Sequence, residues 1–262
     1  MRPIRLLAAA ALLPGLAMAA APGLAILPGT RAWKGFGLAD RIPILGDLAD
    51  AGCPSVTLLR LHPGTRLPPH AAPVDRTYLL LSGTVHVGFG KRWDEARMRS
   101  LPSGSSWVVP ANTSTYEWAE GEAVCQVMAT RSPGDCPRPE EPAIYPAEPD
   151  GWKASGRSER TLLWGEPAVP GCPWVERIRL PAGASPSPAP EPSRSDVAWT
   201  VLAGALRRPS PDVPGAPFPE ELPAGTVAVL PAGAVLAGAS PGGTVVQRQF
   251  AGSGPPACRR VR

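Results

Sequence analysis

The sequence predicts an all-β protein built from two copies of one structural plan. The chain of 262 residues contains 36 prolines and 28 glycines, and 44% of its residues are apolar. Proline ends helices and glycine favours tight turns, so this composition indicates many short strands. Alternating apolar runs recur along most of the chain, which argues against a disordered, proline-rich polymer. The doubled plan follows from a repeated pattern of glycine, proline and aspartate.

Residues 1–21 have the organisation of a secretory signal peptide. Arg2 and Arg5 form a positively charged start, an apolar run follows up to Leu13, and Ala17-Met18-Ala19 offers a small-x-small cleavage site. The stretch is too short and interrupted for a stable anchor, so we expect no stable membrane span after cleavage. An uncleaved anchor is the alternative. A periplasmic or secreted location follows from this prediction.

The charge balance excludes a nucleic-acid surface. Loss of Arg2 and Arg5 leaves 24 of the 26 basic residues against 22 acidic ones, a net charge of +2. The one basic cluster is the tail at 259–262, and such a tail is more often a solvated end than a binding patch.

Five cysteines remain after cleavage, and an exported chain permits disulfides. Cys136 and Cys172 border the region between the two copies and are predicted to pair. Cys125 lies in an apolar strand-like run and is predicted to be the buried free thiol. No CxxC spacing occurs, which disfavours zinc-ribbon and thioredoxin chemistry.

Two blocks recur in the same order in both halves of the chain. The first copy carries Asp75 eight residues before Gly83, and the second carries Asp196 eight residues before Gly204. The second block, a glycine, five residues, a proline, one residue and a turn-former, occurs at 104–112 and 225–233. An unrelated sandwich with similar turn residues would not explain this doubled spacing.

These blocks resemble the cupin family. Its first motif is a glycine, HxH, a glutamate and a closing glycine, and its second is G-x5-P-x-G-x2-H-x3-N. The resemblance covers residues 30–132 well and 160–250 more loosely. It implies two tandem cupin barrels, each a small antiparallel double-stranded β-helix or jelly roll. The first cupin domain is then expected at 22–150, and a more degenerate second domain at 151–262.

In the family, the histidines and the glutamate of the two motifs bind one metal. The four ligand positions are occupied here, in order, by His70, Ala72, Arg76 and Thr115. His70 alone is a usual ligand, and an arginine cannot be deprotonated to coordinate a cation. We therefore expect no metal and no other cofactor in the first copy.

The second copy departs further from the family motif. Its corresponding positions hold Glu191, Ser193, Val197 and Leu236. The resemblance then implies a structural or dimerising half, so a homodimer is one expected assembly. His62 and His86 belong to no HxH pair, and we expect both to be strand histidines with hydrogen-bond partners. The sequence leaves open a cluster of all three histidines.

Strand parity brings several polar residues to the inside of the first barrel. The inward set is expected to be His70, Ala72, Arg76, Tyr78, Thr115 and Glu117. One interpretation is a small anionic or carboxylate ligand bound by Arg76 and oriented by His70 and Tyr78. The other is an internal Arg76–Glu117 ion pair that fills a lost metal site. The sequence leaves both open.

Three functions follow from these alternatives. The missing metal ligands favour a non-catalytic protein of the cell envelope that binds a small ligand or serves a structural role. The second function is a metal-independent isomerase or lyase that uses His70 and Glu117 for proton transfer. The third, a metal-dependent dioxygenase, is the one that the residues most argue against. Whether the protein is an enzyme is left open, with non-catalytic binding favoured.

Overall fold

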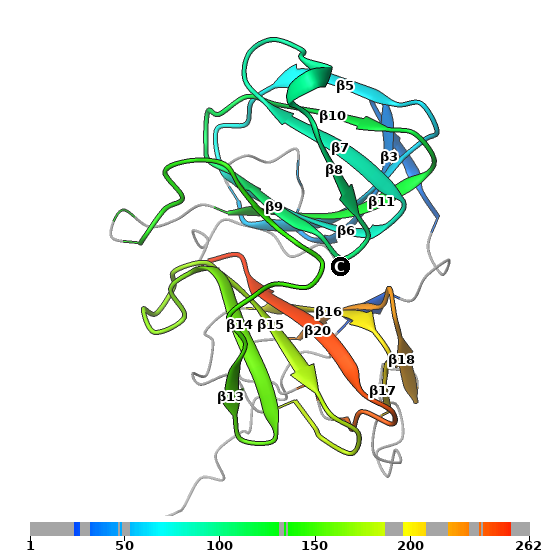
Figure 1. The fold of residues 1–262 in the computed structure, drawn as a ribbon, viewed down its shortest axis with the longest axis vertical. Helices are drawn as coiled ribbons and strands as arrows, with labels where there is room; N and C mark the ends of the chain where they lie inside the picture. Colours follow the sequence, from blue (N-terminus) through cyan, green and yellow to red (C-terminus); the bar gives the residue numbers. More distant parts are fainter. Residues whose placement is uncertain are drawn as a thin grey trace, which may run out of the picture.

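The computed structural model describes residues 24–26, 32–46, 48, 53–130, 134, 136–186, 196–207, 220–230, 236 and 238–252. The predicted signal peptide lies outside them. The described chain is all-β, as predicted, and its single helical segment is the 3-10 turn η1 (Glu95–Arg97). None of the described residues forms a helix that is long and apolar enough to cross a membrane. The strands make two barrels stacked along the long axis of the molecule (Figure 1).

The first barrel consists of a seven-stranded and a four-stranded sheet. The larger sheet contains, in spatial order, β12 (Ala143–Tyr145), β9 (Ser106–Val109), β6 (Asp75–Ser82), β11 (Ala123–Thr130), β4 (Ser55–Leu61), β3 (Ala39–Leu45) and β2 (Lys34–Phe36). The smaller sheet contains β5 (Arg66–His70), β10 (Thr115–Ala119), β7 (Thr84–Phe89) and β8 (Arg99–Pro102). The strand β12 arises from the proline-rich connection between the copies, which therefore supplies an edge strand.

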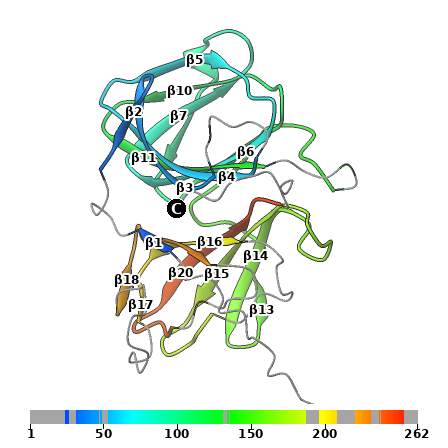
Figure 2. The same cartoon turned by 180° about the vertical axis from the view of Figure 1, so that it is seen from behind.

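The second barrel repeats the larger sheet and has a two-stranded one beside it. The large sheet contains β1 (Leu24–Ile26), β19 (Val227–Leu230), β16 (Val197–Ala203), β20 (Thr244–Phe250), β15 (Trp174–Leu180), β14 (Ser158–Gly165) and β13 (Lys153–Ser155). The small one pairs β17 (Ala205–Arg207) with β18 (Glu221–Pro223). Although β1 falls within the range 22–150 expected for the first domain, it pairs with β19 of the second (Figure 2).

The repeated glycines have the same backbone conformation in both copies. Gly83 and Gly204 have φ values of 83° and 73°, a region that side-chain-bearing residues rarely adopt. A Cβ atom at Gly204 would lie 2.2 Å from the carbonyl oxygen of Gly243, and one at Gly83 would lie 2.4 Å from that of Glu122. The sequence repeat thus marks the same tight hairpin in each barrel.

An apolar layer joins the two barrels. The large sheets face each other, and one buried cluster contains side chains of both, among them Val56, Leu58 and Met128 of the first barrel and Val175 and Val229 of the second. Alternate residues of each strand point the other way, into the interior of their own barrel. The interior and the interface are therefore built by opposite faces of the same strands.

A buried arginine crosses this interface. Arg177 of β15 is fully buried and donates from Nη1 to the carbonyl oxygens of Pro146 and Ala147, at 2.8 and 2.7 Å. Its Nε donates to Gln247 Oε1 at 3.0 Å, and its Nη2 donates to Gly104 O. Burial lowers the pKa of Arg177 to about 10, so the guanidinium remains charged at neutral pH.

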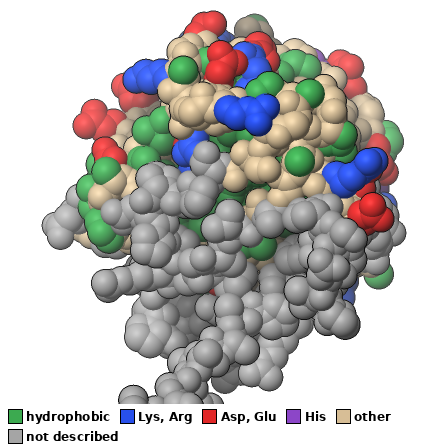
Figure 3. All heavy atoms as spheres, turned by 90° about the horizontal axis from the view of Figure 1, so that it is seen from below, with side chains coloured by type: hydrophobic (Ala, Val, Ile, Leu, Met, Phe, Trp, Pro, Cys, Tyr) green, Lys and Arg blue, Asp and Glu red, His purple; other side chains and the backbone are tan. Residues whose placement is uncertain are grey.

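The predicted Cys136–Cys172 disulfide is present, and Cys125 is a buried free thiol. Cys53 is also disulfide-bonded. In the view from below, acidic and basic side chains are interspersed over the visible described surface (Figure 3). The described surface visible on that side therefore has no patch in which charges of one sign dominate.

Candidate functional site

The polar residues predicted from strand parity meet at one end of the first barrel. His70 ends β5 and is paired in register with Thr115 at the start of β10. Arg76 and Tyr78 lie two residues apart on β6, so both side chains point to the same face. One small pocket is lined by His70, Ala72, Val74, Arg76, Tyr78, Val109, Pro110, Thr113 and Thr115. The structure therefore brings the four family ligand positions of this copy together.

Glu117 lies beneath this pocket. Its side chain is 3% exposed, and its Oε1 accepts a hydrogen bond from the Thr115 hydroxyl at 3.0 Å. Its Oε2 lies 3.8 Å from His70 Nδ1 and is buried without a hydrogen-bond partner among the described residues. Burial raises the pKa of Glu117, because it outweighs the opposing effects of His70, the Thr115 hydrogen bond and Arg76. Burial therefore shifts the balance at this position toward the neutral carboxyl group, relative to an exposed glutamate.

His70 stands at the mouth of the pocket. Its side chain is 35% exposed, and its Nδ1 lies 3.0 Å from the carbonyl oxygen of Pro68. A carbonyl oxygen can only accept, so Nδ1 carries the proton and the imidazole is oriented by this bond.

Arg76 is half-buried and lines the pocket. Its charge and its hydrogen bond to the Tyr78 hydroxyl lower the pKa of Tyr78, but burial and the charge of Glu117 prevail and raise it to about 12. The Nε of Arg76 is buried and has no hydrogen-bond partner within the described part of the chain. The alternative of an Arg76–Glu117 ion pair is not observed among the described residues, where the basic side chain within 4 Å of the Glu117 carboxyl group is His70.

The wall behind Arg76 is rigid. The Tyr78 ring stacks on Trp107 with centroids 4.8 Å apart and an interplanar angle of 2°. Both side chains belong to the buried apolar cluster of the first barrel. The space between the pocket residues is too tight for a water molecule as it stands. A ligand must therefore be very small and must move a side chain of the pocket, and His70, 35% exposed, is one that can move.

The residues of the pocket do not fit a divalent metal. Of the four converging ligand positions only His70 is a usual ligand, and Arg76 places a positive charge where a cation would lie. No group of three or more His, Cys, Asp or Glu side chains within the described ranges could hold a metal ion.

We predict that the purified protein carries no stoichiometric transition metal after dialysis, because one ligand of four cannot retain it. Elemental analysis by plasma mass spectrometry checks this. A variant that combines Ala72→His, Arg76→Glu and Thr115→His completes the family ligand set and serves as the positive control. About one iron, manganese, nickel or zinc per wild-type chain would contradict the prediction.

Glu117 should make the stability of the protein depend on pH. The pKa of this group is higher in the folded chain than the ordinary value of about 4.3 in the unfolded chain. The neutral carboxyl group therefore makes its full contribution to the free energy of unfolding below the pKa of the unfolded chain. This contribution is lost as the pH rises through the pKa of the folded chain. Glu117→Gln should be more stable than wild type at pH 8, by roughly 1–3 kcal/mol, and nearly equal to it at pH 4.

Urea unfolding of both proteins at the two pH values measures this difference. Glu122→Gln, at an exposed position on the same barrel, is the matched control and should follow the wild type throughout. An equal effect of Glu117→Gln at pH 4 and pH 8 would show that the carboxyl group does not titrate in this range.

The second barrel holds apolar side chains at the two matching positions that the structure describes. The bond from Gly183 N to Ser240 O repeats the one from Gly64 N to Ala119 O. Counting from Ser240 places Leu236 at the position of Thr115, where it is buried in the apolar cluster together with Val197. Glu191 and Ser193 lie outside the described residues.

Sequence reasoning missed a charged pair inside the second barrel. Arg248 of β20 contacts Glu176 of β15, and its guanidinium lies 5.3 Å from the Trp174 ring and 5.2 Å from the Trp199 ring. Its side chain is 1% exposed. The signal in the sequence was a charged residue within each of two apolar strands, β15 and β20. Which residues pair depends on the register between these strands, which lie about 70 residues apart in the chain.

The other two histidines lie apart from the pocket. His62 Nε2 is 3.2 Å from Asp40 Oδ2, and His86 Nε2 is 3.2 Å from Glu120 Oε1. The His86 ring also stacks on Trp118. His62 directly follows β4 and has Asp40 as its acidic neighbour, whereas His86 lies on β7 and its Nε2, although close to Glu120, makes no hydrogen bond among the described residues. No three-histidine cluster forms among them and His70.

This architecture is similar to that of known proteins, although the sequence is not. No family model and no curated protein matches the sequence. A structure described as a glyoxylate-induced protein from Pseudomonas aeruginosa is similar, with a TM-score of 0.65 and 15% identity over 94% of this chain and 95% of that one. A cupin 2 conserved barrel domain protein from Leptotrichia buccalis has a TM-score of 0.58 and 17% identity over 83% of this chain and 91% of that one.

A bacterial pirin from Escherichia coli, solved with nickel(II), is also similar. Its TM-score is 0.56, with 12% identity over 88% of this chain and 100% of that one. Likeness at this level of identity shows the fold. The chain is an all-β protein of two tandem cupin barrels.

Proposed function

We propose that this protein is an exported cupin-fold protein of the cell envelope that binds a small carboxylate in its first barrel. The observation that carries the proposal is the guanidinium of Arg76, whose Nε is buried at the pocket and has no hydrogen-bond partner among the described residues. An unsatisfied buried donor on a cation is costly, and an anionic acceptor relieves that cost. Among the residues that the structure describes, no acidic side chain lies within ion-pair distance of Arg76.

The neighbouring groups support an anion of limited size. The raised pKa of Glu117 reduces the negative charge that would repel a carboxylate, and the Tyr78 hydroxyl can donate a hydrogen bond to it. The rigid Tyr78–Trp107 wall limits the ligand to a few heavy atoms. In the second barrel the two matching positions that the structure describes hold Val197 and Leu236, and the buried Arg248 is already paired with Glu176, so the proposal assigns that barrel a supporting role.

Nuclear magnetic resonance titration of the labelled protein tests the proposal. Formate, acetate, glyoxylate and oxalate are the probes, and glyoxylate is included because of the name of the similar Pseudomonas aeruginosa structure. We expect saturable shifts of the Arg76 guanidinium and of Thr115 with at least one carboxylate, and none with the neutral analogue acetamide. Equal response to acetamide, or no response to any probe, would overturn the proposal.

The second candidate is a metal-independent isomerase or lyase. The observation that favours it is that His70 lies beside the buried carboxyl group of Glu117, with Nδ1 3.8 Å from Glu117 Oε2, while the other ring nitrogen of His70, Nε2, could act as the base. Such an enzyme would exchange a carbon-bound proton of its substrate with solvent. Solvent deuterium entering pyruvate at a rate that His70→Gln abolishes would support this candidate over simple binding.

A further inference from the structure

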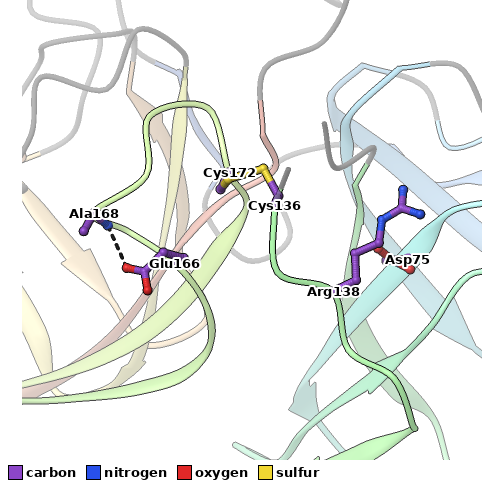
Figure 4. Close-up of a disulfide and its surroundings, with 6 residues drawn as sticks. All are labelled: Asp75, Cys136, Arg138, Glu166, Ala168 and Cys172. Carbon is purple, nitrogen blue, oxygen red and sulfur yellow. Dashed lines mark hydrogen bonds and ion pairs between the residues drawn. A yellow bond between two sulfur atoms is a disulfide. The ribbon is translucent and has the colours of Figure 1, made fainter. Parts of the chain in front are cut away.

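The connection between the barrels is fixed at two points that lie close together in sequence. Cys136 is bonded to Cys172 in the loop between β14 and β15 of the second barrel. Two residues later, Arg138 Nε lies 3.8 Å from Asp75 Oδ2 of the first barrel. Figure 4 shows the disulfide on one side of this short segment and the Arg138–Asp75 pair on the other. The segment thus ties the two barrels to each other.

The second-barrel end of this tie is an ordered loop. Glu166 Oε1 accepts a hydrogen bond from Ala168 N at 3.0 Å (Figure 4). The carbonyl oxygen of Glu166 accepts from Val169 N, and that of Val169 accepts from Cys172 N. Cys172 is therefore held by consecutive turns, and the disulfide transfers this fixed position to Cys136.

The first-barrel end is a buried carboxylate that holds a pocket loop. The Asp75 side chain is 2% exposed, and its Oδ1 accepts a hydrogen bond from Ala111 N at 2.8 Å. Asn112 N donates to the carbonyl oxygen of Ala72 at 2.6 Å, and Asn112 has a φ of 62°. This left-handed conformation is uncommon for residues other than glycine and needs such support.

That loop forms one wall of the candidate binding pocket. Pro110 and Thr113, on either side of Ala111 and Asn112, both line it. Asp75 also directly precedes Arg76 in β6, so one strand end supplies the loop anchor and the guanidinium. A buried carboxylate needs a cation nearby, and Arg138 provides one from the connection.

We infer that Arg138 is a positioning residue for the first-barrel pocket, held in place by the Cys136–Cys172 disulfide and acting on the 110–113 loop through Asp75. The effect of Arg138 on ligand binding rests on the proposed function. The effect of Arg138 on the 110–113 loop does not, because it is a property of the protein without ligand. Because the second barrel supplies Cys172, that barrel would set the geometry of a pocket to which none of its described residues contributes a lining side chain.

Amide hydrogen exchange and acetate titration of the full chain test the inference together. In Arg138→Ala the Ala111 and Asn112 amides should exchange about tenfold faster, because Asp75 loses the cation that fixes its carboxylate. The affinity for acetate should fall about fivefold to tenfold through the misplaced loop. Arg138→Lys should restore most of the protection, and the double variant Cys136→Ser, Cys172→Ser should behave like Arg138→Ala. Arg157→Ala, at an exposed position on the second barrel, is the control.

Unchanged exchange at Ala111 and Asn112 in Arg138→Ala would overturn the inference, whatever acetate does. If exchange accelerates while acetate fails to bind even the wild type, the positioning role stands and the carboxylate proposal fails. Urea midpoints of all variants separate a local effect from a global one, because a positioning role predicts faster exchange with little change in the midpoint. If the cysteine variant does not fold, the Arg138→Ala and Arg138→Lys pair decides the question.

Discussion

Replacing Arg177 with leucine should destabilise the protein by about 3–5 kcal/mol, because the buried Gln247 and three partly buried carbonyl oxygens lose their donor at once and each such loss costs up to about 1–3 kcal/mol. The guanidinium donates hydrogen bonds to the carbonyl oxygens of Gly104, Pro146 and Ala147 and to the side chain of Gln247. Leucine can fill part of the volume but can donate no hydrogen bond. The effect should appear as a lower urea midpoint, with both barrels losing stability because the interface is shared.

Arg179→Leu is the matched control. Arg179 lies two residues along the same strand and on the same face, but its side chain is 37% exposed and pairs with Glu148 and Glu159 at the surface. Surface ion pairs contribute about 0–1 kcal/mol, so this variant should stay close to the wild type. Similar midpoints for the Arg177 and Arg179 variants would show that the interface does not depend on the buried hydrogen bonds.

Arg76→Ala should lower the affinity for a carboxylate by about 10- to 100-fold while leaving the barrel folded. A charge-assisted hydrogen bond contributes about 1.5–3 kcal/mol, which corresponds to a change of this size. Arg76→Lys should recover part of the loss, since it keeps the charge but not the fork of donors. Titration with the carboxylates named above measures the affinities, and far-ultraviolet circular dichroism checks the fold.

Arg60→Ala is the control for this experiment. Arg60 also lies on a first-barrel strand, but it pairs with Asp40 and does not line the pocket. Equal affinities for the Arg76 and Arg60 variants would remove Arg76 from the site. A loss of folded signal in Arg76→Ala would instead assign the guanidinium a structural role.

Much of the fold could be predicted because repeated local signals carry it. The spacing from Asp75 to Gly83, and from Asp196 to Gly204, marks hairpins whose glycines adopt the same left-handed conformation. Such signals act over a few residues and can be read directly from a sequence. The convergence of His70, Arg76 and Thr115 followed from strand parity combined with the family resemblance.

The rest depends on contacts between distant segments, which no local pattern specifies. Arg177 and Gln247 meet because β15 and β20 pair in one register, and a shift of one residue would turn either side chain to the other face. The Arg138–Asp75 pair likewise requires the path of the connection across the surface. Arg76 lines the first-barrel pocket as predicted, but the absence of an acidic side chain within ion-pair distance of it among the described residues depended on distances that strand parity does not give.

The pairing of β1 with β19 has a consequence for how the chain folds. Leu24 lies opposite Val229, so one edge of the second barrel is completed by a segment that precedes the whole first barrel in the chain. Contacts between such distant segments raise the contact order and slow folding, because the entropy cost of bringing the two segments together comes before their pairing adds any stability. The second barrel therefore cannot reach its full sheet as an independent C-terminal fragment. Separating the halves at the proline-rich connection would leave β19 with an unpaired edge, which is a template for association with other chains.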